Sequence, residues 1–366
     1  MRKGSSYSKS RGISRRIAVI SVAILIILAS VIVGYYYSNL SNKPKTGLRI
    51  ALLLPGESND LSWNQAAYET TMSVAKEMNS SGKTVYVSVV EGLYTPSDIT
   101  PAINQFGSQG YDLVIGDGFQ FTQPIVSSGA NYPHTGFLIV GGYATTNNSQ
   151  IVINRGGQEG FILGVLAELM SKTHVVGIIG GENVSEVTWI TVGYVLGAKW
   201  VDPNATVLVS FTGNFNDPSA AESAAVSQHN SGADVIFCSG DGISEGVASA
   251  ANKYGFYYLS NEFNQSSLSP NFWIGGVQYT FGTVFQQALN DWLTNHQFQA
   301  TPYYATFANG GLSLLLSSKV PSSVQHTVNS VYAALKTYQI QIYKELPNGT
   351  LVYSPQFPPF SQFTST

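Results

Sequence analysis

The chain has 366 residues, and its 18 Lys or Arg residues against 21 Asp or Glu residues give a formal net charge of −3. Charged residues make up only 11% of the chain, compared with about 25% in ordinary soluble domains. No basic patch lies beyond the N-terminal segment 1–16, so a nucleic acid is not an expected partner.

The N-terminal segment has the pattern of a membrane anchor. Residues 1–16 carry Lys and Arg but no acidic residue, residues 17–34 carry no charge, and three tyrosines follow. About 20 apolar residues span a bilayer as a helix, whereas the apolar part of a cleaved signal peptide has about 7–15. We predict a basic cytoplasmic tail at 1–16, a transmembrane anchor in preference to a signal segment at 17–37, and a stalk at 38–47.

This anchor predicts a location in the cell membrane, crossed once, with the rest of the chain outside because the basic flank stays in the cytoplasm. The one cysteine, Cys238, lies far from the anchor. A lipid-modified N-terminal cysteine and an internal disulfide are therefore excluded.

Two series of strands and helices follow. The apolar run 48–55 is typical of a strand buried on both faces, and alternating strand and helix patterns predict parallel sheets with right-handed crossovers. In the first series we expect strands at 48–55, 84–91, 111–118 and 135–142 and helices at 63–79, 96–110 and 123–131. In the second we expect strands at 174–181, 206–213, 233–242 and 256–261 and helices at 158–173, 188–202, 217–232 and 243–255.

The outer domain, 48–366, is too long for most single cores and suits two Rossmann-like lobes joined by a hinge. We expect lobe 1 at about 48–153 and 261–292, and lobe 2 at about 154–260 and 293–355, with the chain crossing between them three times. Ligands of open parallel sheets bind beyond the carboxyl ends of the strands. The sequence therefore predicts an α/β protein with a cleft between its lobes.

The first loop that would face this cleft contains Ser62-Trp63-Asn64-Gln65. Ser62 and Gln65 have the spacing of a capping box, in which each side chain accepts a hydrogen bond from the other's backbone N–H. Trp63 and Asn64 lie in the first helical turn, beyond the end of a strand, where they are candidates for ligand contact. Alternatively, Trp63 packs against its own helix and Asp60 caps that helix, because carboxylates suit helix N-termini.

Five motifs in chain order resemble the basic membrane protein family of ABC-transporter substrate-binding proteins, whose best-understood members are purine nucleoside receptors. The family pattern D-x-S-F/W-N-Q is matched by residues 60–65, and its GYDLIVGVGF segment by GYDLVIGDGF at 110–119. The other three matching stretches are EGFILGVLAELMSKTHVVGIIGG at 159–181, GNFNDP at 213–218 and GADVIFCSGDGISEGVASAA at 232–251.

The resemblance implies a type I periplasmic-binding-protein fold and capture of a small solute, a nucleoside first, for an ABC-transporter permease. In the family, the aromatic residue on this loop stacks on the ligand's base, and the Asn that follows it forms a hydrogen bond with the base. These two positions correspond to Trp63 and Asn64. Phe215 is the candidate for the second stacking ring, although it could simply cover the following helix. We place Asp60 and the loop Gly240, Asp241 and Gly242 in the same cleft.

Other positions depart from the family. Gly141 replaces an acidic residue, Asn261 or Glu262 aligns with the aspartate that holds ribose hydroxyls, and Tyr279 replaces a lysine. These changes predict a largely uncharged, ring-containing solute, with a sugar as the second choice. Asp117 replaces an apolar residue and is either a ligand group or a turn aspartate; Phe119 is a further loop aromatic.

Two other functional classes remain open. The chain could be a membrane-anchored sensory binding protein for a sugar or other solute, and not part of a transporter. Alternatively, Asp60, Asp117, Asp241 and Glu262 could converge in the cleft of a hydrolase, although no nucleophile elbow, P-loop or paired-cysteine motif is present. We expect no catalytic residue, no cofactor and no metal site.

Overall fold

The computed structural model describes residues 47–345 and 351–364, and residues 48–366 form one compact unit. The predicted tail at 1–16, the segment at 17–37 and all but the last residue of the stalk lie outside the described residues. Within the described ranges, no helix is both long enough and apolar enough to cross a membrane.

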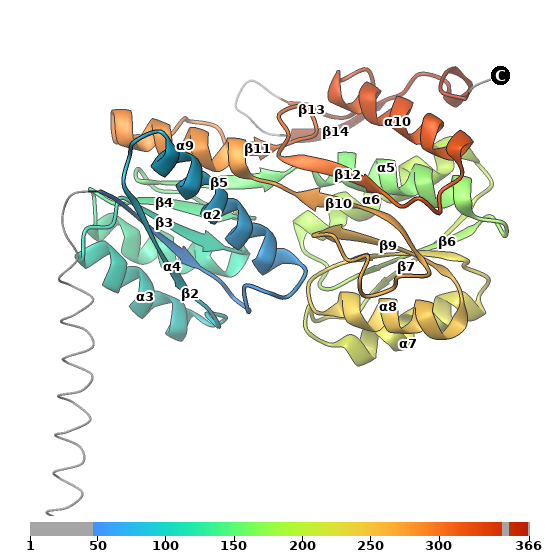
Figure 1. Cartoon of the computed structure of the whole chain (residues 1–366), viewed down its shortest axis with the longest axis horizontal. Coiled ribbons are helices and arrows are strands. Elements are labelled where there is room, and N and C mark those ends of the chain that lie inside the picture. Colours follow the sequence, from blue (N-terminus) through green and yellow to red (C-terminus); the bar gives the residue numbers. More distant parts are fainter. Residues whose placement is uncertain (1–46, 346–350, 365–366) are drawn as a thin grey trace, which may run out of the picture. The chain divides into compact units, whose positions relative to one another are not determined.

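The first lobe is built on a parallel six-stranded sheet in the order β2–β1–β3–β4–β5–β11 (Figure 1). Its strands are β1 (Leu48–Leu53), β2 (Val85–Val90), β3 (Leu113–Asp117), β4 (Gly136–Val140), β5 (Ser149–Asn154) and β11 (Tyr303–Ala305). Its helices are α2 (Trp63–Ser80), α3 (Pro96–Ser108), α4 (Thr122–Ser128) and α9 (Gly282–Asn295), with short 3-10 turns η1 (Phe119–Phe121) and η2 (Gly129–Asn131).

Alternation along β1 explains the layers of this lobe. Ile50 and Leu52 enter the apolar cluster that contains residues of α2 and α9, whereas Ala51 and Leu53 enter the cluster of α3 and α4. Successive side chains of a strand point to opposite faces. The continuous apolar run therefore gives a strand covered by helices on both sides, as its sequence predicts.

The second lobe is built on a six-stranded sheet in the order β12–β10–β9–β8–β6–β7, in which β12 alone runs antiparallel to its neighbour. Its strands are β6 (Val175–Gly180), β7 (Thr206–Phe211), β8 (Val235–Ser239), β9 (Tyr257–Glu262), β10 (Trp273–Tyr279) and β12 (Leu312–Leu316). Its helices are α5 (Gly156–Met170), α6 (Ser185–Val201), α7 (Pro218–Asn230), α8 (Ile243–Tyr254) and α10 (Ser322–Lys336). The hairpin β13 (Gln341–Glu345) and β14 (Leu351–Gln356) and the turn η3 (Phe360–Gln362) follow.

Helices α5 and α6 pack backbone to backbone. A Cβ atom on Gly160 would lie 1.9 Å from the carbonyl oxygen of Ile190, and one on Gly164 would lie 2.1 Å from that of Tyr194. Only glycine permits this approach, since a methyl group needs about 3.5–4.0 Å to a neighbouring atom. The contact fixes the position of α6, whose first turn reaches the cleft.

The two-lobed α/β fold is confirmed, but the lobe boundaries need correction. The chain passes between the two large sheets after β5, after β10 and after β11. The segment 261–292 was expected in the first lobe, yet β10 pairs with β9 and β12 of the second sheet. Conversely, β11 joins the first sheet, although 293–355 was expected in the second lobe. An apolar strand buried on both faces does not encode which of two similar sheets it joins.

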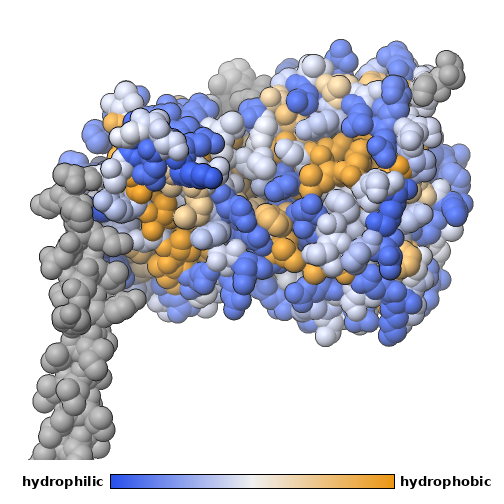
Figure 2. All heavy atoms as spheres, viewed as in Figure 1, coloured by the Kyte–Doolittle hydropathy of each residue, from blue (hydrophilic) through white to orange (hydrophobic). Residues whose placement is uncertain are grey.

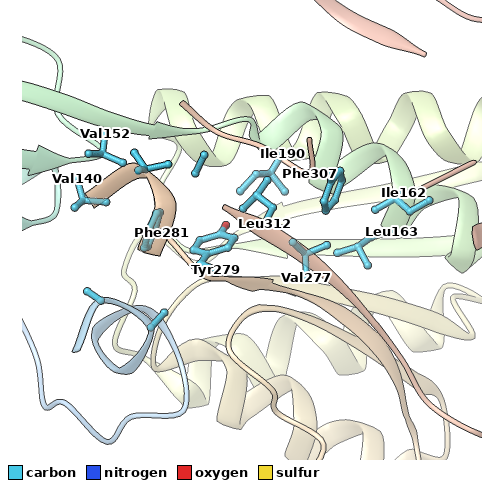
Figure 3. Close-up of a cluster of buried hydrophobic side chains, with 14 of the residues drawn as sticks. Val140, Val152, Ile162, Leu163, Ile190, Val277, Tyr279, Phe281, Phe307 and Leu312 are labelled. Carbon is cyan, nitrogen blue, oxygen red and sulfur yellow. The ribbon is translucent and has the colours of Figure 1, made fainter. Parts of the chain in front are cut away.

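A shared apolar core lies where the chain crosses between the lobes (Figure 3). Tyr279 and Phe281 lie between Val140 and Val152 of the first sheet and Val277 of the second. The molecular face in Figure 2 is largely hydrophilic, with its apolar residues gathered in separate patches. The crossing region is thus a packed joint and not a flexible linker.

Candidate functional site

The loop before α2 is held by Asp60, and the predicted capping box is wrong. The Asp60 carboxylate accepts hydrogen bonds from the backbone N–H groups of Ser62 at 2.9 Å, Asn64 at 3.2 Å and Gln65 at 3.0 Å. The Ser62 side chain makes no cap and instead donates to the Glu262 carboxylate of the second lobe. An aspartate two residues before the N-cap Ser62 satisfies the free N–H groups and leaves the serine side chain available.

Trp63 extends from this capped turn into the space between the lobes. Its indole Nε1–H donates to the Asp117 carbonyl oxygen at 3.3 Å. The indole also meets the rings of Tyr279 and Phe281 edge to face, at centroid distances of 6.0 and 6.4 Å. The ring therefore packs against residues of the crossing region and is not enclosed within its own helix layer.

A cavity lies between the lobes and combines aromatic, apolar and acidic side chains. From the first lobe it is lined by Pro55, Gly56, Trp63, Tyr94, Gly118, Phe119 and Gln120. From the second lobe it is lined by Val184, Glu186, Val187, Ile190, Phe215, Asn216, Ser239, Gly240, Asp241, Glu262 and Tyr279. Both groups lie beyond the carboxyl ends of strands, where parallel sheets bind their ligands.

Most of the residues singled out in the sequence line this cavity. They are Trp63, Phe119, Phe215, Gly240, Asp241, Glu262 and Tyr279. The other five candidates do not line it: Asp60, Asn64, Asp117, Gly242 and Asn261. Phe215 is presented by close packing, because a Cβ on Gly181 would lie 2.3 Å from its ring.

Asn64 is engaged by protein groups in this conformation. Its amide nitrogen donates to Asp60 at 2.6 Å and to Asp241 at 3.2 Å, and its oxygen accepts from the Gly56 N–H at 2.8 Å. The residue is only 1% exposed. Asn64 thus joins the two lobes, and its predicted contact with a ligand requires these bonds to rearrange.

Glu186 is a cavity residue that the sequence analysis missed. It lies in the first turn of α6 and accepts a hydrogen bond from Asn154 of the first sheet at 3.0 Å. Burial raises the pKa of Glu186 to about 7, against the opposing effect of that hydrogen bond. A helix start predicted at 188 left this glutamate in a loop; a start at Ser185 places it in the first helical turn, where acidic residues are favoured.

Glu186 lies next to the position where the sequence lacks an expected acid. Gly141 has a φ of +69°, and a Cβ built on it would lie 2.9 Å from Oε2 of Glu186. A side chain at residue 141 would therefore compete with this carboxyl group. The second lobe supplies the acidic group that the first lobe lacks at this point.

Glu159 of α5, a fully buried acid, was also missed. Its carboxylate accepts from the Tyr279 hydroxyl at 2.7 Å, and the Asn261 amide donates to the same hydroxyl at 3.2 Å. Burial raises the pKa of Glu159 to about 8 and that of Glu262 also to about 8. Carboxyl groups therefore lie beside positions 141, 261 and 279, but none of them replaces the positive charge of the lysine expected at 279. That the solute is largely uncharged stays a prediction.

Asp117 is the last residue of β3 and is fully buried. Neither of its carboxyl oxygens has a hydrogen-bond partner among the described residues. Burial raises the pKa of Asp117 well above its ordinary value, and the charges of Asp60, Asp241, Glu186 and Glu262 raise it further. An unpartnered buried carboxyl group is stable only in its neutral form or beside a cation.

Asp241 completes the acidic group. Burial raises its pKa well above the ordinary value, and the nearby carboxyls of Asp60 and Glu262 add to that rise. The four acids proposed for a hydrolase, Asp60, Asp117, Asp241 and Glu262, do converge. The surroundings of Asp117, Asp241 and Glu262 favour proton retention, because they are buried and like charges lie close by.

One further group of possible metal ligands lies elsewhere in the described chain. His174 Nδ1 lies 2.6 Å from Oε1 of Glu168 and 3.5 Å from Oδ2 of Asp202, at the opposite end of α6 from Glu186. The hydrogen bond to Glu168 raises the pKa of His174. The arrangement is explained as an ion pair at the base of the second lobe.

Comparisons with known proteins agree with this fold. A family model described as ABC transporter substrate-binding protein PnrA-like matches residues 48–300. The transcriptional activator protein med of Bacillus subtilis is 31% identical over 225 residues, covering 61% of this chain and 68% of that protein. The ABC transporter nucleoside-binding protein BmpA of Lactococcus lactis is 32% identical over 237 residues, covering 64% of this chain and 66% of BmpA.

The chain thus spans about two thirds of the length of these two relatives. Among solved structures, an ABC transporter solute-binding protein from Conexibacter woesei matches with a TM-score of 0.65 at 23% identity, covering 82% of this chain and 99% of that one. This last likeness concerns the fold alone.

Proposed function

Because this chain belongs to the family of PnrA-like ABC transporter substrate-binding proteins, we propose that it captures a small ring-containing solute for an ABC importer. The observation that carries the proposal is the set of aromatic rings lining one cavity between two lobes. Trp63 and Phe119 come from the first lobe, and Phe215 and Tyr279 from the second. Closure of the lobes on the solute then presents a loaded shape to a membrane permease.

A nucleoside is the solute that these rings suit best. Stacking a base on an aromatic side chain contributes about 1–3 kcal/mol, and Asn216, Ser239 and Asp241 offer polar groups in the same cavity. The relative from Lactococcus lactis is named for nucleoside binding, which supports the same class here. We further propose that the predicted anchor at 17–37 holds this domain at the outer face of the cell membrane.

No chemical change of the solute is part of the proposal. Asp60 is engaged by three backbone N–H groups, and Glu262 accepts from Ser62. Both carboxyl groups are therefore engaged at the joint between the lobes. A hydrolase would need one acid free to protonate a leaving group and another free to activate water.

A second candidate role is sensing. The relative from Bacillus subtilis is named a transcriptional activator, and this name is the reason to consider a regulatory role here. Uptake of radiolabelled nucleoside by cells with and without this gene separates the two roles. Loss of uptake on deletion favours transport, and unchanged uptake with an altered transcriptional response favours sensing.

Isothermal titration calorimetry of the full-length chain with adenosine and guanosine tests the binding proposal. We expect binding by the unmodified chain and at least about tenfold weaker binding by Trp63→Ala, the equivalent of about 1.4 kcal/mol. Tyr254→Ala is the matched control, because this exposed tyrosine ends α8 outside the cavity. Equal affinities for the Trp63 variant and the control would contradict a stacking role.

A further inference from the structure

The cavity wall is acidic without any compensating base. Glu186, Asp241 and Glu262 line it, and none of its described lining residues is Lys, Arg or His. Arg155, which precedes α5, places its guanidinium over the ring of Tyr304 at 3.9 Å. The electrostatic character of the cavity is therefore that of a cation site.

These acids come from both lobes, so closing the lobes brings them together. Asp60 and Asp117 belong to the first lobe, and Glu186, Asp241 and Glu262 belong to the second. Like charges repel strongly where water is excluded, and the repulsion falls when a proton or a cation is taken up. Asp117 has no hydrogen-bond partner among the described residues, so no protein donor there stabilises a negative charge on its carboxyl group.

From this arrangement we propose that the solute carries a protonated amine in addition to its ring, and that the ammonium group binds at Glu186. This inference rests on the proposed function and specifies the solute of the same cavity. Glu186 is the natural partner because Asn154 occupies its Oε1, while glycine at 141 leaves its Oε2 uncovered by a side chain. Glu262 and Asp241, in contrast, are bonded by Ser62 and Asn64 across the lobe interface.

Binding of a cation at Glu186 releases a proton. Burial raises the pKa of Glu186 to about 7, so near pH 7 the empty cavity holds a proton there part of the time. An adjacent ammonium stabilises the ionised carboxylate and lowers this pKa, which expels the proton. The titratable groups near Glu186 on the surrounding elements, whose pKa values its charge raises, are Asp117 of β3, Glu159 of α5, Glu262 of β9 and Tyr279 of β10.

The test compares adenosine with 5′-amino-5′-deoxyadenosine, which differ by one charged group. Calorimetry of the full-length chain at pH 7, in phosphate and in Tris, gives the affinity and the number of protons released. We expect the amine to bind about tenfold more tightly, since a hydrogen bond to a charged group contributes about 1.5–3 kcal/mol. Its binding heat should differ between the two buffers because a proton is released, whereas that of adenosine should not.

Variants assign the effect to one carboxyl group. Glu186→Gln should abolish most of the preference for the amine and its proton release. Glu182→Gln is the matched control and should keep the preference, since Glu182 lies four residues earlier, in the β6–α6 loop, and does not line the cavity. If Glu186→Gln and Glu182→Gln behave alike, the assignment to Glu186 is overturned.

A second pair separates failure of this inference from failure of the nucleoside proposal. If both nucleosides bind equally, or adenosine binds more tightly, the amine inference is overturned and the proposed function stands. If neither nucleoside binds, 2-phenylethylamine is compared with 2-phenylethanol. Binding of the amine alone supports the inference while excluding a nucleoside; equal binding, or binding of neither, overturns the inference.

Discussion

In the first lobe, Asp60 holds the loop before α2 by short-range bonds, whereas in the second lobe Glu186 and Glu159 are held by distant partners. Asp60 bonds backbone groups two to five residues away. Glu186 bonds Asn154, 32 residues away, and Glu159 bonds Tyr279, 120 residues away. The first lobe therefore presents a pre-formed aromatic loop, and the second presents acids whose positions depend on the whole fold.

The difference also separates what each lobe supplies to a solute. The first lobe supplies Trp63 and Phe119 to the cavity and no carboxyl group, although Asp60 and Asp117 lie behind its wall. The second supplies Glu186, Asp241 and Glu262. Both lobes supply aromatic rings, since Phe215 and Tyr279 come from the second, but the carboxyl groups in the cavity wall come from the second lobe alone.

The largest expected effect comes from the close packing of α5 against α6 in the second lobe. Gly160→Ala would place a Cβ atom 1.9 Å from the carbonyl oxygen of Ile190, so the two helices must separate. We expect the free energy of unfolding to fall by about 3 kcal/mol, since overpacking a rigid contact is destabilising. Urea denaturation followed by circular dichroism measures this loss.

The matched change in the first lobe is Gly282→Ala at the start of α9. A Cβ atom on Gly282 meets nothing within 4 Å, so the free energy of unfolding should change by less than about 0.5 kcal/mol. Similar losses for the two variants would show that the α5–α6 contact yields easily. The second lobe would then hold its acids no more rigidly than the first lobe holds its loop.

An intermediate effect is expected from the buried acids on the pH dependence of stability. Burial raises the pKa of Glu159 from 4.5 to about 8, so between these values the folded protein holds a proton that the unfolded chain has released. Its stabilising contribution is therefore complete at low pH and is lost as the pH rises through about 8. Between pH 5 and 8 we expect Glu159→Gln to reduce the fall in unfolding free energy by about 2–3 kcal/mol.

Glu91→Gln provides the control of opposite sign. Hydrogen bonds from Ser58 lower the pKa of Glu91, so its contribution is present above 4.5 and is lost only as the pH falls further. The slope between pH 5 and 8 should be the same as in the unmodified chain. If Glu159→Gln leaves that slope unchanged as well, the buried glutamate is ionised in the folded protein and its burial is incomplete.

The same contrast explains how much of the fold was predictable. Most strands and helices follow from local patterns, such as the apolar run at β1 and the alternation with polar loops. The membership of β10 was not predictable, because a strand buried on both faces fits either sheet. Local sequence encodes the type of an element, while long-range pairing decides its place.

For the site, the sequence indicated the aromatic residues and four acids as candidates, but not Glu186 or Glu159. Trp63 and Phe215 lie in short contiguous motifs, at 60–65 and 213–218, that can be recognised in the sequence. Glu186 and Glu159 lie at helix positions that appear ordinary along the chain, and only folding brings them beside Gly141 and Tyr279. A comparison with the family at one position at a time does not find an acid that a distant segment places beside that position.

The smallest expected effect on stability comes from Asp60, which caps α2 and carries a negative charge near other acids. Asp60→Ala removes the acceptor of three backbone N–H groups, and we expect the free energy of unfolding to fall by about 1–2 kcal/mol. Asp217→Ala at α7 removes a single such bond, from the Ala220 N–H at 3.0 Å, and should cost less.

Asp60→Asn separates the two roles of this residue. The amide oxygen can still accept from Ser62 and Gln65, while the variant removes a negative charge beside Asp117 and Asp241. We therefore expect the asparagine variant to lose less than half of what the alanine variant loses, because relief of repulsion offsets the lost bond. Thermal and urea unfolding of the full-length variants measure the difference. Equal losses for Asn and Ala would mean that the carboxylate charge itself holds the loop, and that the first lobe depends on electrostatics as much as the second.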